Sequence, residues 1–281
     1  MIKPFAVITF DSEFLLKGQS LAIRLSLPHI DAISEKILKK TDIISYLRNK
    51  YDVRESKLKA ILIYQDNELY LVQITSENIL FISANFHGDT VKYRRQKGGG
   101  KNEMIAKATG LSNNSKLNIL DATCGLGSDA FILASIGGHV TMIERVAEIH
   151  ALVEDALMRA AYWGRLSDSK LLEILNRMKL IEADAVTHML SINRESRPDV
   201  VYLDPMFPPR RKSAKVKKEM NVLHNIVGSD TDSHEILRVA LNCARKRVVV
   251  KRPKAAQTLS CEKANYTFKG KSNRFDVYIC T

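Results

Sequence analysis

The stretch LNILDATCGLGSDAFILASIGGHVTMIE, residues 117–144, decides the fold. It opens with a short apolar run and turns at a segment that contains Gly125 and Gly127. A helical pattern follows, and then a second apolar run that ends at Glu144. Glycine permits a sharp turn and a close approach of the backbone, so this order indicates a strand, a tight turn, a helix and a second strand. Such a unit is typical of an α/β protein.

The same alternation continues towards the C-terminus. The strand-like runs KLIEAD, DVVYLD and RVVVKRP are separated by the helical patterns VAEIHALVEDALMRAAYW and HEILRVALNCA. Short apolar strands separated by helices indicate a parallel sheet that is covered on both faces. The last segment, YTFKGKSNRFDVYIC, predicts two further strands joined by a basic turn. We therefore predict a doubly wound α/β domain over residues 102–281.

Residues 1–90 differ in their pattern of strand-like and helical runs. They contain the strand-like runs FAVITF, SLAIRLSL, KAILIY, LYLVQI and ILFISANF, with one helical stretch in DAISEKILKKTDIISYLRNKY. This pattern predicts a small α+β domain, and its residues suggest no chemistry. Residues 91–101, VKYRRQKGGGK, form a basic, glycine-rich connector. Three consecutive glycines fit either a flexible linker or a loop whose backbone approaches a ligand.

The charge of the chain favours a polyanionic partner. Lys and Arg number 43 against 31 Asp and Glu, a formal net charge of +12. From residue 201 to 281 there are 17 basic and 7 acidic residues. Such an excess favours RNA or DNA, because each neutralised phosphate releases counterions. A membrane surface is disfavoured, since no amphipathic basic helix with an aromatic face accompanies the charge.

Other features of the composition point to a cytoplasmic protein. No window approaches the roughly 18 apolar residues that span a bilayer. Asp11 and Glu13 fall where a secretory signal would continue its apolar run. The four cysteines form no C-x-x-C pair and the histidines have no ligand spacing, so we expect neither a disulfide framework nor a metal.

The turn after the first strand predicts a nucleotide pocket. Glu144, at the end of the second strand, is placed to accept hydrogen bonds from ribose hydroxyls. The turn formally satisfies the G-x-G-x-x-A pattern of a NAD-binding oxidoreductase, but a pyrophosphate would meet the carboxylates of Asp121 and Asp129. S-adenosyl-L-methionine (SAM) brings an ammonium and a sulfonium, which carboxylates favour. The D-x-x-x-G-x-G arrangement from Asp121 to Gly127 resembles motif I of class I SAM-dependent methyltransferases.

The fourth predicted strand leads into a second motif, DPMFPP, residues 204–209. Ligands bind at the carboxyl edge of such sheets, where this motif would lie. It resembles the (D/N/S)-P-P-(F/Y/W) motif of methyltransferases that act on exocyclic base amines, with Met206 in place of the usual second proline. We expect the Asp204 side chain and the Pro205 carbonyl to hold the amino hydrogens, and Phe207 to stack on the base. The competing interpretation is an ordinary Asp-Pro turn that ends a strand.

Basic residues cluster around this predicted pocket. The run RRKSAKVKK follows the motif directly, and two further basic residues follow the fifth strand. A charge run is often only a solvated face, but its position favours a rim that contacts phosphates. The residues expected to contact RNA are Arg94, Arg95, Lys97, Lys101, Arg210, Arg211, Lys212, Lys215, Lys217, Lys218, Lys251 and Arg252.

In combination, YRRQKGGGKNEMIAKATG, DATCGLGSDAFILAS, MIERV, VYLDPMFP, KSAKVKKEM, KRVVVKRP and KGKSNRFDVYIC resemble the RsmJ (YhiQ) family of bacterial small-subunit ribosomal RNA guanine-N2 methyltransferases. The resemblance covers residues 92–280. It implies a Rossmann-like class I methyltransferase sheet, SAM as cofactor, and N2 of a guanine in 16S rRNA as the acceptor, in free RNA or in the small ribosomal subunit.

The resemblance and the motifs together give the expected SAM-contacting positions. These are Asp121, Gly125, Gly127, Ser128, Asp129, Glu144, Arg145, Asp184, Ala185 and Asp204. The match is weakest at Asp184 and Ala185, where the family carries a pair of serines, and Asp184 could instead cap the next helix. The DPMFPP motif alone does not separate guanine N2 from adenine N6. A non-catalytic RNA-binding module is a further alternative, and the oligomeric state is not indicated.

Overall fold

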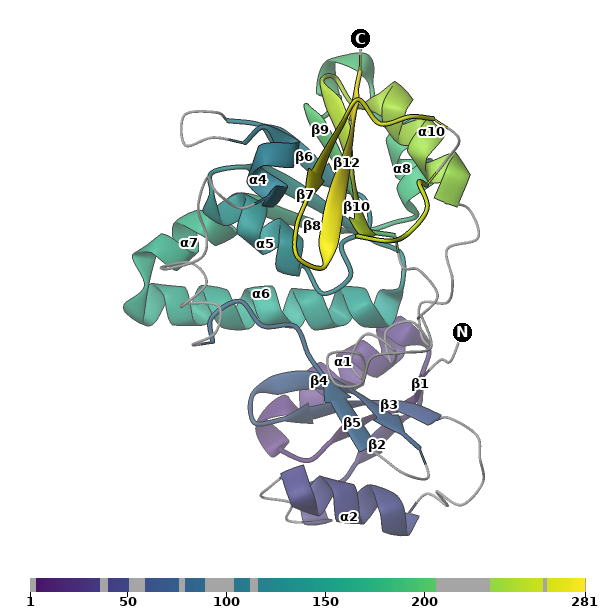
Figure 1. Ribbon diagram of the computed structural model, residues 1–281. Helices are drawn as coiled ribbons and strands as arrows, with labels where there is room; N and C mark the ends of the chain where they lie inside the picture. The colour runs from purple at the N-terminus through teal and green to yellow at the C-terminus, as the bar shows by residue number, and fades with distance from the viewer. Residues whose placement is uncertain are drawn as a thin grey trace. The chain divides into compact units, whose positions relative to one another are not determined.

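The computed structural model describes residues 4–35, 40–50, 59–75, 79–88, 104–111, 116–205, 233–259 and 262–280. Its helices and strands form two compact units, and each is described by itself (Figure 1). The boundary lies between Ser83 and Ala84, earlier than the expected residue 90. Residues 84–88 belong to the second unit because Phe86 stacks there on Phe131, with the ring centroids 5.4 Å apart. The connector expected at residues 91–101 lies outside the described residues.

The first unit is a five-stranded mixed sheet in the order β2-β1-β3-β4-β5. Strand β1 is parallel to β2 and β3, whereas β3, β4 and β5 are antiparallel neighbours. Between β3 and β4, Asp66 and Asn67 have positive φ angles of 51° and 61°, which is typical of the tight turn of a hairpin. The elements are β1 (Pro4–Thr9), η1 (Ser12–Phe14), α1 (Leu15–Leu25), β2 (His29–Asp31), η2 (Ile33–Glu35), α2 (Lys40–Lys50), β3 (Lys59–Gln65), β4 (Glu68–Ile74) and β5 (Ile79–Ile82).

Helix α1 corrects one expectation, because the run SLAIRLSL is mostly helical and not a strand. Leu21 and Ala22 are buried, whereas Leu16 and Ile23 are more than three-quarters exposed. This spacing follows the helical period of 3.6 residues and not the alternation of a strand. The alternation of apolar and polar residues in this run is therefore only a feature of the local sequence. Packing of one face of the helix against the sheet determines its secondary structure.

The second unit carries a seven-stranded sheet in the order β11-β12-β10-β9-β6-β7-β8. Strands β8, β7, β6, β9 and β10 are parallel, and β12 pairs antiparallel with β10 and β11. The elements are α4 (Met104–Thr109), β6 (Asn118–Asp121), α5 (Ser128–Ser135), β7 (His139–Glu144), α6 (Ala147–Ser167), α7 (Ser169–Leu175), β8 (Met178–Glu182), α8 (Ala185–Ser191), η4 (Arg194–Ser196), β9 (Val200–Leu203), α10 (Ser233–Cys243), β10 (Arg247–Pro253), β11 (Tyr266–Lys269) and β12 (Asn273–Ile279).

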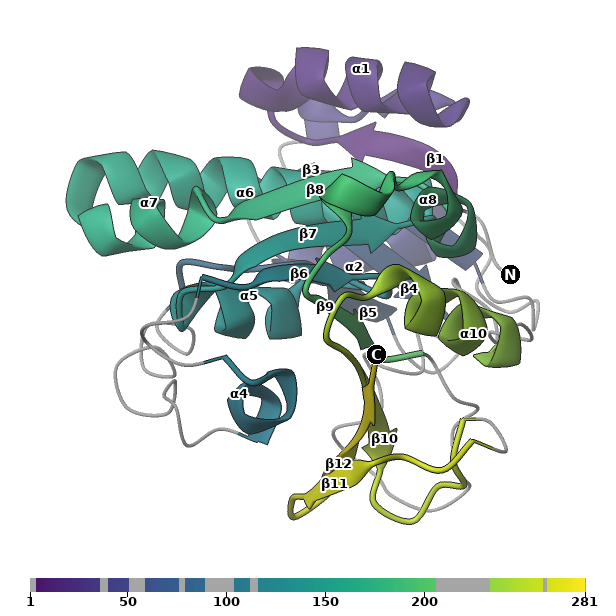
Figure 2. The same cartoon turned by 90° about the horizontal axis from the view of Figure 1, so that it is seen from above.

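Helices cover both faces of this sheet, as predicted. Helices α4 and α5 lie on one face, and α8 and α10 lie together on the other (Figures 1 and 2). All four residues of β9 are fully buried, as expected for a central strand covered on both sides. The order and directions of the strands are those of a Rossmann-like class I methyltransferase sheet. No helix in the described part of the chain is long and apolar enough to cross a membrane.

The register of the parallel strands brings their carboxyl ends together. Asp121, the last residue of β6, pairs with Tyr202 of β9, and Leu203 pairs with Val250 of β10. Strand β9 ends at Leu203, so Asp204 leaves the sheet beside Lys251, whereas β10 continues to Pro253 through its pairing with β12. Because ligands of such folds bind at the carboxyl edge, we expect a functional site at this edge of the sheet.

Candidate active site

The turn between β6 and α5 requires glycine at two positions. Gly125 and Gly127 have φ angles of +53° and +74°, which residues with a side chain rarely adopt. A Cβ atom at Gly127 would also lie 2.9 Å from Cζ of Phe86, too close for the packed ring to remain in place. Among the described residues, no atom beyond Gly125 and its chain neighbours lies within 4 Å of a Cβ built there, so this part of the structure leaves the backbone open to a ligand.

Glu144 ties the end of β7 to this turn. Its Oε2 accepts the backbone N–H of Gly125 at 3.0 Å, and its Oε1 accepts that of Val146 at 2.8 Å. The side chain is buried, and burial raises the pKa of Glu144 to about 7 although the two N–H donors oppose the rise. Glu144 therefore holds the glycine turn in shape at the same edge where sequence analysis expects it to bind ribose.

Two carboxylates from different parts of the chain contact the ammonium of Lys251. Nζ of Lys251 lies 2.6 Å from Oδ2 of Asp129, in the first turn of α5, and 2.9 Å from Oδ2 of Asp204, just after β9. The hydroxyl of Tyr202 also donates to Oδ2 of Asp129, at 2.6 Å. Asp121 is buried at the end of β6, and the charges of Asp129 and Asp204 both raise its pKa. We call Asp121, Asp129, Asp204 and Lys251 the carboxyl-edge cluster.

The carboxyl-edge cluster is short of positive charge. Burial, reinforced by the neighbouring Asp129, raises the pKa of Asp121 to about 8. Burial also raises the pKa of Asp204, and Lys251 opposes that rise. Burial works against the charged form of Lys251, but Asp204 and Asp129 outweigh it and raise its pKa. Asp129 and Asp204 face one ammonium, and Asp121 adds a third carboxyl group that a nearby cation would help to ionise. This edge of the sheet therefore favours a cationic ligand, although the whole chain is strongly basic.

Sequence reasoning missed two residues that hold this site together. The hydroxyl oxygen of Thr123 accepts the backbone N–H of Asp204 at 2.6 Å, and the Thr123 N–H donates to Oδ1 of Asp121 at 3.2 Å. Thr123 thus joins the glycine turn to the Asp204 turn. Tyr202 is fully buried beneath the site and orients Asp129. The only available signal was their position beside motif residues, which does not reveal where a hydroxyl points.

The structure places part of the expected catalytic motif. Asp204 follows β9, with a side chain 38% exposed, and Pro205 is buried next to it. Phe207 and the basic residues at 94–101 and 210–218 lie outside the described residues.

The expectation that Lys251 and Arg252 contact RNA phosphates does not agree with the structure. The Lys251 ammonium is held by two carboxylates, and its side chain is only 21% exposed. Arg252 is 5% exposed, and its guanidinium donates to the backbone carbonyl of Gln257. Alternation along β10 points the two side chains to opposite faces of the sheet, so neither extends from the edge towards solvent.

The remaining expected cofactor positions lie around the same edge. Asp184 caps α8, because its Oδ1 accepts the backbone N–H of Thr187 at 2.9 Å and its hydroxyl at 3.0 Å. The helix-cap interpretation of Asp184 is therefore confirmed, and its contact with adenine stays a prediction. Ala185 is buried. Ser128, the first residue of α5, and Arg145, directly after β7, are exposed.

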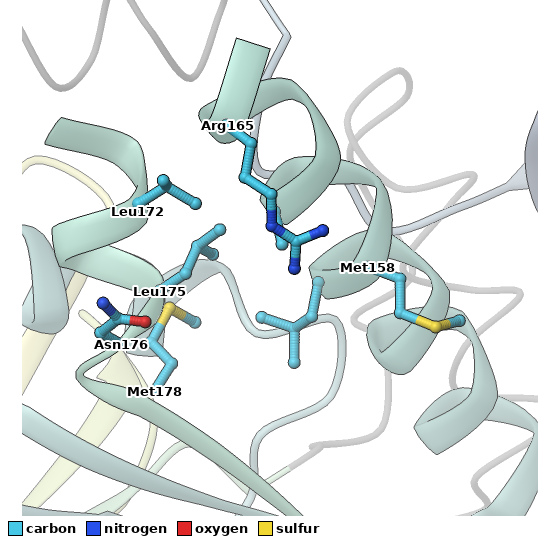
Figure 3. A pocket seen from close by; sticks show the side chains of 8 residues that line it. Met158, Arg165, Leu172, Leu175, Asn176 and Met178 are labelled. Carbon is cyan, nitrogen blue, oxygen red and sulfur yellow. The ribbon is translucent and has the colours of Figure 1, made fainter. Parts of the chain in front are cut away.

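A separate cavity of about 430 Å³ lies between α6, α7 and the start of β8 (Figure 3). It is lined mainly by apolar side chains, and Arg165 reaches into it from α6. Met178, at the amino end of β8, forms part of the lining. The cavity is therefore at the wrong end of the strands to belong to the carboxyl-edge cluster.

The residues present fit SAM. Among the described residues the space beside Gly125 is open and Glu144 lies next to it, where its contact with a ribose stays a prediction. The carboxyl-edge cluster offers carboxyl groups to the sulfonium and the ammonium. Among the described residues no group of three or more His, Cys, Asp or Glu side chains is arranged to hold a metal ion.

Comparison with known proteins identifies the family of this chain. The family model for SAM-dependent methyltransferases matches residues 46–280. The ribosomal RNA small subunit methyltransferase J of Cellvibrio japonicus is 44% identical over 218 residues, 78% of this chain and 82% of that protein. The chain belongs to the ribosomal RNA small subunit methyltransferase J family. The protein of the same name from Pseudoalteromonas atlantica is 45% identical over 222 residues, 78% of this chain and 84% of that protein.

A solved structure extends the match to the first unit. The SAM-dependent methyltransferase of Neisseria gonorrhoeae covers 98% of this chain and 96% of its own, with 28% identity and a TM-score of 0.67. Membership of the methyltransferase J family makes the chain a SAM-dependent methyltransferase and removes the NAD-binding alternative and the non-catalytic RNA-binding module. The family match also begins well before residue 92, so it includes part of the first unit.

Proposed function

We propose that this protein transfers a methyl group from SAM to the exocyclic N2 amine of a guanine in 16S ribosomal RNA. The observation that carries the proposal is the position of Asp204 and Pro205. They follow β9 at the carboxyl edge, one hydrogen bond away from the glycine turn through Thr123. The relatives' names, which specify small-subunit ribosomal RNA, support the choice of substrate.

The chemistry of an exocyclic amine explains these residue types. Its lone pair is delocalised into the base, so the amine is a weak nucleophile that must be oriented. The Asp204 carboxylate and the Pro205 carbonyl are acceptors for the two amino hydrogens. The methyl group passes from the sulfonium to N2, the sulfur keeps the electrons of the broken bond, and the amine proton passes to Asp204 and then to water. Positioning of the reacting atoms supplies much of the acceleration.

Charge supports an RNA substrate. The formal net charge is +12, while the carboxyl-edge cluster is locally acidic. A basic chain attracts the RNA backbone, and the acidic cluster suits the cationic cofactor. The basic runs at residues 92–101 and 210–218 are our candidates for the phosphate contacts. Because ribosomal subunits are the proposed substrate, we place the protein in the cytoplasm.

Adenine N6 is the competing acceptor, because the same pair of carbonyl and carboxylate acceptors suits either amine. Membership of the methyltransferase J family, which the sequence resemblance associates with guanine N2, favours guanine. The same experiment shows whether the substrate is naked RNA or an assembled subunit.

The test is methylation in vitro with isotope-labelled SAM. Purified protein is incubated with deproteinised 16S RNA or with small subunits, both from cells that lack the enzyme, and the digested nucleosides are analysed by mass spectrometry. We expect the label in N2-methylguanosine. Label in N6-methyladenosine would transfer the protein to the adenine class, and no label in either RNA form would contradict the proposal.

A further inference from the structure

We propose that Lys251 is a positioning residue for methyl transfer, which holds the Asp204 carboxylate ionised and fixed by its Oδ2 so that Oδ1 faces the target amine. This inference rests on the proposed function, since it assigns a role to the residue that acts on the amine. It replaces the phosphate contact that sequence analysis expects for Lys251.

The geometry of Lys251 is that of a bridge between three elements. It leaves β10 and reaches the first turn of α5 through Asp129, at 2.6 Å, and the end of β9 through Asp204, at 2.9 Å. Both distances are those of charge-assisted hydrogen bonds. Two of its three N–H donors are therefore used inside the protein, which leaves little for a phosphate.

The charges that face Asp204 come from every element around it. Asp129 on α5 is a like charge that disfavours its ionised form. Asp121 on β6, whose pKa is raised to about 8, and the hydroxyl of Tyr202 on β9, whose pKa is also raised, are neutral neighbours below pH 8. Lys251 and, more weakly, Arg252, both on β10, favour it. The backbone N–H of Asp204 is bound by the neutral hydroxyl of Thr123. Lys251 is therefore the main group that offsets burial and the neighbouring acids.

This offset matters for the reaction. A carboxylate can accept the amine hydrogens, and later the proton, only when it is ionised before the substrate arrives. Without Lys251, Asp204 would share a partly desolvated edge with Asp121 and Asp129 and would take up a proton at higher pH. The acidic limb of the activity profile would then move towards alkaline pH.

The experiment compares Lys251→Met and Lys251→Arg with the wild type. Methionine keeps the length of the side chain and removes its charge, whereas arginine keeps the charge. The matched control is Lys246→Met, which removes an ammonium from Asp199, 3.1 Å away, near the opposite end of the same strand. Single-turnover rates at saturating RNA and SAM are measured from about pH 6 to 9, with KM for RNA and the melting temperature.

For Lys251→Met we expect a rate at least about 10-fold lower near pH 6.5 that recovers towards the wild-type value near pH 9. Lys251→Arg should restore most of the rate at low pH, and Lys246→Met should leave the profile unchanged. A rise in KM for RNA with an unchanged rate would overturn the proposal in favour of a phosphate contact. A uniform loss of rate at every pH would overturn it in favour of a merely structural ion pair.

A second readout separates this inference from the proposed function. Carboxyl ¹³C shifts of labelled aspartates report ionisation without any substrate, and Asp204→Asn identifies the Asp204 signal. In Lys251→Met this signal should titrate at higher pH than in the wild type. An unchanged titration would overturn the role of Lys251 even if the enzyme methylates guanine. A shifted titration in a protein that methylates no RNA would instead contradict the proposed function alone.

Discussion

The hydroxyl oxygen of Thr123 lies 2.6 Å from the backbone nitrogen of Asp204, so the turn proposed to bind the cofactor and the turn proposed to hold the substrate share one hydrogen bond. Thr123 comes from the loop after β6 and Asp204 from the end of β9, two strands that are neighbours in the sheet. We therefore expect a displacement of the glycine turn to shift Asp204, the residue proposed to orient the amine.

Replacing Thr123 tests this link. Thr123→Val keeps the shape of the side chain but removes the acceptor of the Asp204 N–H, which should weaken transition-state binding by about 1–3 kcal/mol. Thr123→Ser keeps the hydroxyl and should stay close to the wild type. The measurement is kcat/KM at saturating SAM. Equal values for the valine and serine variants would show that the hydrogen bond is not used.

Glu144→Ala should weaken SAM binding by about 1–3 kcal/mol, because it removes the charged acceptor at the ribose position and loosens the backbone at Gly125. Isothermal titration calorimetry measures the change. Glu173→Ala, an exposed glutamate on α7, serves as the control and should bind SAM normally. Wild-type affinity in Glu144→Ala would remove Glu144 from the cofactor site.

Asp204→Asn should lower the rate of methyl transfer by about 10²–10⁴-fold, because the amide keeps one acceptor but cannot take up the amine proton. Binding of RNA should be nearly unchanged, since affinity for RNA comes mainly from phosphate contacts. Rates come from single-turnover assays and affinities from filter binding at matched salt. Near-normal rates in this variant would exclude Asp204 as the proton acceptor.

The stability of the cofactor-free protein should fall as pH rises. Burial raises the pKa of Asp121 to about 8 and that of Glu144 to about 7, above their ordinary values of 3.8 and 4.5. Between about pH 4 and pH 8 the folded state keeps protons that the unfolded state has released, so the free energy of unfolding decreases across this window.

Urea denaturation without SAM at pH 5 and at pH 8 measures this effect. Asp121→Asn, which cannot ionise, should show a smaller decrease than the wild type, whereas Glu195→Gln, an exposed acid in η4, should show the same decrease. If Asp121→Asn and the wild type lose equal stability, Asp121 is already ionised in the folded protein at pH 5.

Replacing pairs of basic residues within Arg210–Lys218 should lower the slope of log K against log salt by about 0.7–0.9 for each phosphate that the variant no longer neutralises. Methylation at low RNA concentration should suffer more than methylation at saturating RNA, because these residues position the RNA without taking part in the chemistry. A wild-type slope in the variants would show that the run is a solvated face and would move the search to residues 92–101.

The sequence predicted those parts of the site that depend on local pattern. The glycines of the turn, Glu144 at the end of β7 and Asp204 at the end of β9 were all expected at the carboxyl edge, and the structure brings them there. This prediction succeeds because all the strands of a parallel sheet end at the same edge.

The parts that were not predicted depend on distant pairing. Lys251 follows three valines in a basic stretch of sequence. Its side chain lies close to Asp204 only because β10 pairs with β9 in the sheet. The helical structure of α1 was missed because its alternating residues fit a strand locally, whereas the sheet of the first unit buries a helical face. Partners that come from other elements cannot be read from the spacing of residues along the chain.

The most direct test of the central claim is mass spectrometry of nucleosides from 16S RNA of cells with and without this protein. Cells that lack it are complemented with the wild-type chain or with Asp204→Asn. We predict that N2-methylguanosine decreases in the deletion strain, returns with the wild-type chain and does not return with Asp204→Asn. An unchanged level of N2-methylguanosine in the deletion strain, or full restoration by Asp204→Asn, would contradict the account.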